Sequence, residues 1–224
     1  QLRENIKKIG AGMLECEPEK VDFDGEKVYL TDGEKSVSLA DIATKSQVNN
    51  TIPVDVTATY SSPVSPPPYM VGMVEIELDK ETGSIEILDY QSVIDCGIPV
   101  NPNLARVQAE GGIGQGIGMA LYENVTYNAQ GKIAENSFMQ YKIPTRLDMG
   151  RINVEFETSY EPSGPFGVKS IGEIVINTPA PALAHAIYRA TGVWHRTVPF
   201  TPEKILMSML DPQWKEIDRR VKES

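Results

Sequence analysis

The sequence predicts an α+β fold in which mixed strands and helices form one or two lobes. Alternating apolar and polar residues, typical of half-buried strands, occur at 74–78, 84–90 and 151–158. Helical patterns lie before, between and after these segments, and the last is an Ala-rich stretch ending before Gly192. The segments have no repeating strand–helix–strand rhythm, and this favours α+β over α/β.

Residues 1–56 predict a lobe made of a helix and a hairpin. Apolar residues recur every three or four positions within 1–15, which indicates an amphipathic helix. Residues 21–39 predict a β-hairpin around a turn at 31–34. A short helix is expected at 41–48.

A Pro-rich connector is predicted at 57–70, because its run of prolines cannot pair in a sheet. A second lobe, 71–202, then contains most of the strands and the longer helices. Within it we expect the strand at 84–90 to be followed by a separate strand at 93–96. A charged tail is predicted at 203–224, and a short helix begins at its boundary.

Composition limits the class of protein. The chain has 224 residues, 31 acidic and 21 basic, with a net charge of −10 and 41% hydrophobic residues. This acidity argues against nucleic-acid binding, which needs clustered Lys and Arg. No apolar run approaches the ~20 residues that span a bilayer. Cys16 and Cys96 are too few for a disulfide framework or an iron–sulfur site, and we expect a cytoplasmic protein. Because Gln1 falls inside a helical pattern, we expect the chain to be a fragment.

A single carboxylate follows a Pro/Gly-rich segment near the C-terminus. Residues 161–166 (Glu-Pro-Ser-Gly-Pro-Phe) disfavour regular structure, and Gly-Val-Lys-Ser-Ile-Gly-Glu follows at 167–173. Glu173 is thus expected where a loop meets the start of a helix. A carboxylate in this position can act in catalysis or can simply complement the helix dipole, and the residues alone leave both open.

Five glycines lie within eight residues of one predicted helix, at Gly111, Gly112, Gly114, Gly116 and Gly118. Each costs a helix about 1 kcal/mol relative to alanine. Such a helix is expected where another group must approach the backbone closely. The pattern is not a G-x-G-x-x-G nucleotide fingerprint following a strand. Tight helix packing and ligand approach both remain open.

Four motifs follow one another along the chain. They are D-x-G-x-x-x-N-P at 95–102, Q-x-E-G-G-x-x-Q-G-x-G-x-A-L-Y-E at 108–123, Y-K-I-P-T-x-x-D at 141–148 and G-x-K-x-x-G-E at 167–173. In this order and spacing they resemble the xanthine dehydrogenase/aldehyde oxidase family of molybdenum hydroxylases. The resemblance is to the C-terminal part of the molybdopterin-binding subunit, and it extends to about Pro202.

The resemblance implies roles for individual residues. Glu173 matches the family's general base, a carboxylate that takes a proton from a metal-bound hydroxyl. Gln108 matches a glutamine that hydrogen-bonds the oxo group of the molybdenum centre. Lys169 is expected either to bind cofactor or to form a structural ion pair, while Gln115 receives no role. No residue is expected to ligate the metal, because sulfurs of the pterin hold it. The cofactor-binding candidates are Gln108, Gly111, Gly112, Lys169, Ser170 and Gly172.

The implied cofactor is molybdenum–molybdopterin, either in its simple form or as the cytosine dinucleotide. Iron–sulfur clusters and FAD are expected on other domains or subunits. The implied partners are the remainder of the molybdenum subunit, the iron–sulfur and flavin subunits or domains, and a small-molecule substrate, within an oligomeric parent enzyme. Neither nucleic acid nor a membrane is expected as a partner.

The implied reaction is hydroxylation of an electron-poor carbon in a purine, a related N-heterocycle or an aldehyde, with oxygen derived from water. The alternative is a non-catalytic fragment or assembly module that only folds and docks with partner subunits. In either case we expect the isolated chain to be inactive.

Other prominent residues are assigned structural roles. Asp95 and Asn101 are residue types that favour turns and helix caps. His185 and His195 show no metal-ligand spacing. Residues 141–145 are expected to fix a loop.

Overall fold

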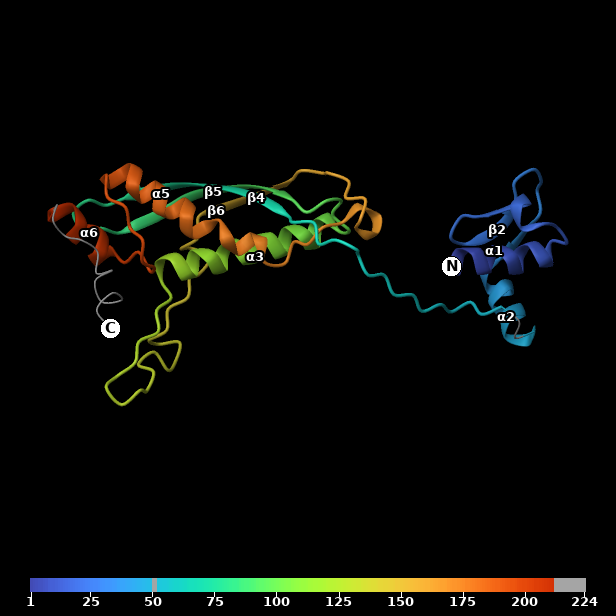
Figure 1. Cartoon of the computed structure of the whole chain (residues 1–224), viewed down its shortest axis with the longest axis horizontal. Helices are drawn as coiled ribbons and strands as arrows, with labels where there is room; N and C mark the ends of the chain where they lie inside the picture. Colours follow the sequence, from blue (N-terminus) through green and yellow to red (C-terminus); the bar gives the residue numbers. More distant parts are fainter. Residues whose placement is uncertain (50–51, 212–224) are drawn as a thin grey trace. The chain divides into compact units, whose positions relative to one another are not determined.

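The computed structural model describes residues 1–49 and 52–211, which form two compact units (Figure 1). Unit 1 is Gln1–Ser61, and unit 2 begins at Ser62. The boundary between the units falls within the Pro-rich segment predicted as a connector at 57–70.

Unit 1 packs a helix against a small antiparallel sheet and against a second helix. Its core contains Ile6, Val28 and Ile42. Both predicted helices are confirmed. The predicted hairpin is confirmed but gains a further strand, because residues just after the first helix pair along the other edge of β2. The elements are α1 (Leu2–Met13), a 3-10 turn (Pro18–Lys20), β1 (Val21–Phe23), β2 (Lys27–Leu30), β3 (Ser36–Ser38) and α2 (Leu39–Asn49).

Unit 2 is built on a mixed three-stranded sheet of β4 (Tyr69–Leu78), β5 (Ile85–Asp95) and β6 (Arg151–Phe156). β4 pairs with β5 antiparallel, and β5 pairs with β6 parallel. The separate strand predicted at 93–96 is wrong, since β5 runs on without a break. Ser92 does not interrupt it, because this side chain is buried and its hydroxyl donates to the Asn153 carbonyl of β6.

The helices of unit 2 begin and end where capping residues predict. The side chain of Asn101 accepts hydrogen bonds from the backbone N–H of Asn103 and Leu104 at the start of α3. Gly192, with a φ of 78°, ends α5 in the left-handed conformation that glycine adopts without strain. The helices are α3 (Pro102–Leu121), α4 (Ile174–Asn177), α5 (Pro179–Thr191) and α6 (Pro202–Leu210).

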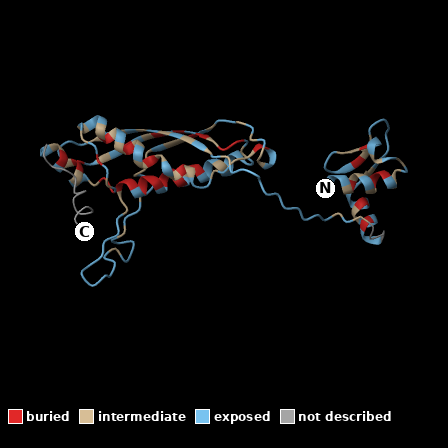
Figure 2. Ribbon diagram, in the orientation of Figure 1, coloured by how far each residue is buried: buried red, intermediate tan, exposed pale blue. Residues whose placement is uncertain are grey.

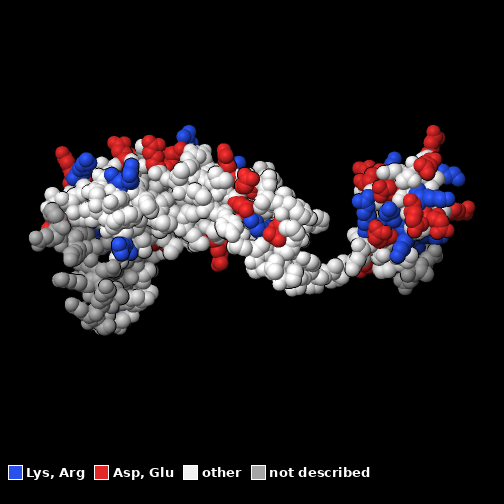
Figure 3. All heavy atoms as spheres, turned by 45° about the horizontal axis from the view of Figure 1, so that its top comes forward, with Lys and Arg blue, Asp and Glu red and all other residues white. Residues whose placement is uncertain are grey.

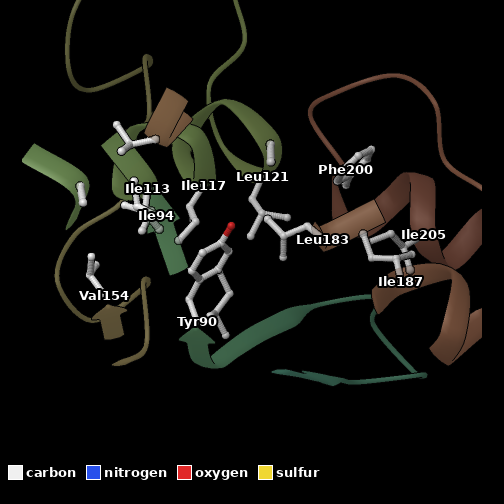
Figure 4. Close-up of a cluster of buried hydrophobic side chains, with 14 of the residues drawn as sticks. Tyr90, Ile94, Ile113, Ile117, Leu121, Val154, Leu183, Ile187, Phe200 and Ile205 are labelled. Carbon is white, nitrogen blue, oxygen red and sulfur yellow. The ribbon is translucent and has the colours of Figure 1, made fainter. Parts of the chain in front are cut away.

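The core of unit 2 lies between the sheet and helices α3 and α5 (Figures 1 and 4). Ile113 and Ile117, one turn apart on α3, are fully buried, as is Leu183 of α5. Tyr90 of β5 is also fully buried, and its hydroxyl donates to Thr178 Oγ1 at 2.8 Å. The phenol therefore joins the sheet to the start of α5. In Figure 2 the buried residues of α3 lie along its C-terminal part, from Ala109 onward.

The tail predicted at 203–224 requires a correction at its start. Ile205 of α6 is fully buried in the core of unit 2, so the residues up to Leu210 belong to the folded unit. Burial of the apolar face of this short helix holds it against the core of unit 2, although charged residues lie beside it in the sequence. The rest of the predicted tail, 212–224, lies outside the described residues.

Charge is distributed differently over the two units. Figure 3 shows basic and acidic side chains interspersed over unit 1, whereas the face of unit 2 seen there has a broad uncharged area. Within the parts of the chain that the structure describes, no helix combines the length and apolar character needed to cross a bilayer.

Candidate active site

Helix α3 lies unusually close to α4 and α5 because two of its glycines have no side chain. A Cβ built on Gly112 would stand 2.2 Å from Val175 Cγ2, and one on Gly116 would stand 2.6 Å from Pro179 Cγ. Both distances are far below van der Waals contact. Tight helix packing, one of the two explanations left open by the sequence, therefore accounts for this pair of glycines.

The close packing of α3 and α4 leaves an open pocket of about 640 Å³ beside it. Five residues predicted for the site meet here, although more than 50 positions in the sequence separate the α3 group from Gly172 and Glu173. The α3 residues are spaced i, i+3, i+4 and i+7, which places them on one helical face. The pocket is lined by Val107, Gln108, Gly111, Gly112, Gln115, Gly172, Glu173, Ile176 and Asn177.

Gln108 connects the two sides of the pocket. Its Nε2 donates to the carbonyl oxygen of Gly172 at 2.9 Å. This bond fixes the peptide group that immediately precedes Glu173. An amide side chain has two donor hydrogens and an acceptor oxygen, so the bond does not exhaust its capacity. The role on the molybdenum oxo group stays a prediction.

Glu173 occupies the residue before α4 but does not cap that helix. Its side chain makes no capping hydrogen bond, and the residue is exposed. Among the described residues its carboxylate has no hydrogen-bond or ion-pair partner. Since α4 has only four residues, its dipole is a weak reason for a carboxylate here. The geometry favours a carboxylate that is open to a ligand.

Lys169 and Ser170 do not line this pocket. Lys169 Nζ lies 2.5 Å from Asp95 Oδ2, and the lysine side chain is only 7% exposed. The sequence left two roles open for Lys169, a cofactor contact or a structural ion pair, and the structure shows the ion pair. Ser170 is exposed and lies outside the lining set. A cofactor role for these two residues stays a prediction that the pocket does not support.

Two further residues with amide side chains, Gln115 and Asn177, line the pocket. Neither received a role from the sequence alone. Gln115 lies two helical turns after Gln108, and its spacing on α3 could have identified it. Asn177 lies four residues after Glu173, one turn along α4. The spacing of Asn177 from Glu173 is a weaker signal than the spacing on α3, because α4 was not expected as a separate helix.

The structural assignments hold for the turn and loop residues. Asp95 Oδ1 accepts from Gly97 N at 3.0 Å, which caps the turn after β5. Thr145 N and Oγ1 both donate to Asp148 Oδ2 at 2.6 Å, and this closes the loop predicted at 141–145. The Tyr141 hydroxyl donates to the Glu123 carboxylate and ties that loop to the end of α3.

The histidines stand apart from the pocket. His195 is buried, with Nε2 3.1 Å from Ser208 Oγ. His185 packs edge-on against Trp194. Within the described ranges, no group of three or more His, Cys, Asp or Glu side chains is arranged to hold a metal ion.

The lining of the pocket suits a polar heterocyclic cofactor. Three amide side chains can each donate and accept hydrogen bonds, as the ring nitrogens and oxygens of a pterin require. Apart from the adjoining backbone of each glycine, no atom of the described residues lies within 4 Å of the place where a Cβ of Gly111 or Gly172 would stand, so a ligand can approach bare backbone at both. Among the described residues that line the pocket, only Glu173 has a charged side chain.

Comparison with known proteins identifies the family. The sequence profile of the molybdopterin cofactor-binding domain matches residues 1–150, a range that includes Gln108 but ends before Glu173. A probable hypoxanthine oxidase of Escherichia coli K12 is 37% identical over 93% of this chain. The gamma subunit of the 6-hydroxypseudooxynicotine dehydrogenase complex of Paenarthrobacter nicotinovorans is 33% identical over 90% of it.

A solved structure extends the likeness to the fold. Quinoline 2-oxidoreductase from Pseudomonas putida 86 superposes with a TM-score of 0.81 and 27% identity over 94% of this chain. The chain spans only 28% of that protein, and 22% and 27% of the two relatives compared by sequence. The fold, the four motifs and these matches together show that the chain belongs to the molybdopterin cofactor-binding domains of the xanthine dehydrogenase/aldehyde oxidase family of molybdenum hydroxylases.

Proposed function

We propose that this chain forms the wall of a molybdenum hydroxylase site that carries the general base, Glu173. The observation that supports this most is the pocket between α3 and α4. There an unpartnered carboxylate lies beside the amide of Gln108 and the bare backbone of Gly111. These residues come from two motifs that are distant in the sequence.

The proposed reaction replaces a carbon–hydrogen bond of the substrate by a carbon–oxygen bond. The oxygen derives from water, and two electrons and two protons leave. The cofactor, when bound, supplies the redox centre that accepts the two electrons. Glu173 accepts a proton at a carboxylate oxygen from the water-derived nucleophile, which increases the nucleophile's reactivity. An exposed carboxylate in this chain becomes enclosed only when the remainder of the enzyme covers the pocket.

Gln108, Gly111 and Gly172 keep a direct cofactor role in the proposal, and Gly112, which also lines the pocket, keeps an indirect one. Gln108 holds the Gly172 peptide with one N–H and can offer its remaining groups to the cofactor. Gly111 and Gly172 provide backbone without side chains against which a flat ring system can lie, whereas Gly112 shapes the pocket by letting Val175 of α4 pack against α3. The simple form of molybdopterin and its cytosine dinucleotide form are both retained as candidate cofactors.

A purine is the proposed substrate class, with related N-heterocycles and aldehydes as the other candidates. The 37% identity to a probable hypoxanthine oxidase favours the purine. The remainder of the molybdenum subunit and separate iron–sulfur and flavin modules are the proposed partners. A relative named as one subunit of a dehydrogenase complex supports a multi-subunit parent.

The test replaces Glu173 by glutamine in the full-length parent enzyme. Glu173→Gln keeps the shape but removes the proton acceptor, so turnover should fall by about 10²–10⁴-fold with molybdenum content unchanged. Glu77→Gln, at an exposed position of β4, is the matched control and should leave turnover unchanged. A loss below about threefold in the fully loaded variant would contradict the role of general base.

The competing proposal is an assembly module without catalytic residues. It predicts that Glu173→Gln leaves turnover intact, and that disruption of the pocket alters only subunit association. Molybdenum and pterin content, measured beside the oligomeric state in the same preparations, separates the two proposals.

A further inference from the structure

The loop that carries Glu173 is attached to the end of β5. Ile98 N donates to the Gly167 carbonyl at 2.9 Å, and Lys169 N donates to the Cys96 carbonyl at 2.7 Å. Gly97 lies between them with a φ of 70°, and a Cβ there would stand 2.2 Å from the Gly167 oxygen. The loop therefore crosses the strand end at a distance that only glycine permits.

A partly buried ion pair reinforces this crossing. Lys169 Nζ lies 2.5 Å from Asp95 Oδ2, with the two side chains 7% and 21% exposed. The other oxygen of Asp95 accepts from Ser159 Oγ at 2.6 Å and from Gly97 N at 3.0 Å. The ammonium group also lies 5.3 Å from the centre of the Tyr69 ring. The lysine is held from several sides.

The titration of Asp95 agrees with this geometry. Burial of the carboxyl acts to raise its pKa, but the hydrogen bonds from Lys169, Ser159 and Gly97 outweigh that effect. The pKa is lowered from 3.8 to about 2. The carboxylate is therefore charged throughout the pH range in which enzymes work, and the ion pair persists there.

We propose that the Asp95–Lys169 ion pair positions Glu173 by fixing the loop that bears it, an inference that rests on the proposed role of Glu173 as general base. Lys169 is four residues before Glu173. At the other end of this short span, Gln108 holds the Gly172 carbonyl. The backbone leading to the carboxylate is thus attached to β5 on one side and to α3 on the other.

Stability alone is a poor reason for such a pair. Burying two charges costs solvation, and apolar residues of similar volume often stabilise a fold equally well. An ion pair with short, directional contacts instead restricts the loop to one conformation. A displacement of about 1 Å at a reacting group can reduce the reaction rate by about 10²-fold. A loop held in one conformation therefore favours catalysis, because it keeps the carboxylate of Glu173 in position.

The experiment uses the full-length holoenzyme and compares Lys169→Met with Lys169→Arg. Lys169→Met should lower kcat by about 10–100-fold at normal molybdenum content and unchanged KM, because the base is present but misplaced. Lys169→Arg keeps the charge and should restore most of the rate. Arg151→Met is the control, since it removes an ion pair with Asp89 whose arginine is 71% exposed and lies away from the loop.

Lys169→Met leaves Asp95 without its partner and can prevent folding. The paired variant Asp95→Asn/Lys169→Met removes both charges and should fold, load molybdenum and show the same loss of kcat. Full kcat in this loaded variant would overturn the proposal. Failure of this variant to fold or load would also overturn it, because the pair would then serve the fold.

A double-mutant cycle that combines Lys169→Met with Glu173→Gln distinguishes this inference from the proposed function. If Lys169 acts through Glu173, Lys169→Met should cause no further loss in the Glu173→Gln enzyme. An equal loss in both backgrounds would mean that Lys169 acts independently, and the positioning role would be wrong. Retained kcat in Glu173→Gln alone would remove the proposed function and the inference with it.

Discussion

The glycines of helix α3 serve two different purposes. Gly112 and Gly116 are pressed against Val175 and Pro179, where any side chain would collide. Gly111 also borders the pocket, but among the described residues no atom from outside its own stretch of helix lies within 4 Å of its missing Cβ. The first pair allows two helices to meet, and the second position leaves backbone accessible to a ligand.

The same difference distinguishes the helix contacts of α3, which this chain completes by itself, from the pocket, which it leaves open. The helix contacts are finished within unit 2, since the partners α4 and α5 belong to the same unit. The pocket is open, and the chain spans only 22% of the length of a relative with 37% identity.

The isolated chain should bind no molybdenum cofactor tightly and turn over no substrate. Tight binding and catalysis need preorganised contacts on several sides, and the pocket supplies one wall. Metal analysis of the purified chain measures this directly. Near-stoichiometric molybdenum would mean that the open side is already complete.

Gly116→Val in the parent should destabilise the helix contacts of α3 and reduce molybdenum content. A branched side chain would meet the Pro179 ring and the Ile176 carbonyl, and overpacking of this kind costs about 1–3 kcal/mol. Gly112→Val should act in the same direction through Val175. Thermal unfolding and molybdenum content are measured together. Raised stability with unchanged loading would show that this stripe faces solvent.

Neighbouring alanine substitutions give the sharpest comparison, because Gly111 and Gly112 differ only in what lies opposite. Gly111→Ala should raise the stability of the chain by up to about 1 kcal/mol through helix propensity. Gly112→Ala should lower it, since contact with the buried Val175 outweighs the same gain. Urea unfolding of both variants tests this, and equal shifts would refute the distinction.

The sequence predicted most elements of this arrangement but not their partners. The cap at Asn101 and the end of α5 before Gly192 depend on local chemistry, and both were confirmed. Gln108 and Glu173 were also expected in one site, and the structure brings them to one pocket.

What the sequence could not predict depends on contacts between distant segments. The pairing of Lys169 with Asp95 joins residues 74 positions apart, and neither carries a local signal for the other. The continuity of β5 through Ser92 likewise depends on β6, which arrives much later in the chain. Asn177 was missed because a helix of four residues leaves almost no periodic pattern.

The smallest predicted effect concerns pH. The packing of α3 against α4 and α5 depends on apolar contacts and should be insensitive to acid, whereas the loop bordering the pocket depends on Asp95. Because the folded-state pKa of Asp95 is lowered to about 2, its contribution is fully present above pH 3.8 and is lost as pH falls toward 2. Unfolding midpoints measured from pH 5 to 2 should fall less steeply in Asp95→Asn than in the natural sequence. Parallel curves would contradict the assignment.

The most direct test of the central claim is the single-turnover rate at which substrate reduces the parent enzyme in the absence of an electron acceptor. This rate isolates the chemical step from later electron transfer. We expect reduction of Glu173→Gln, with full molybdenum content, to be slower than that of the natural enzyme by at least about 10²-fold. Reduction at a rate within about threefold of the natural enzyme would contradict the role of Glu173 as the base.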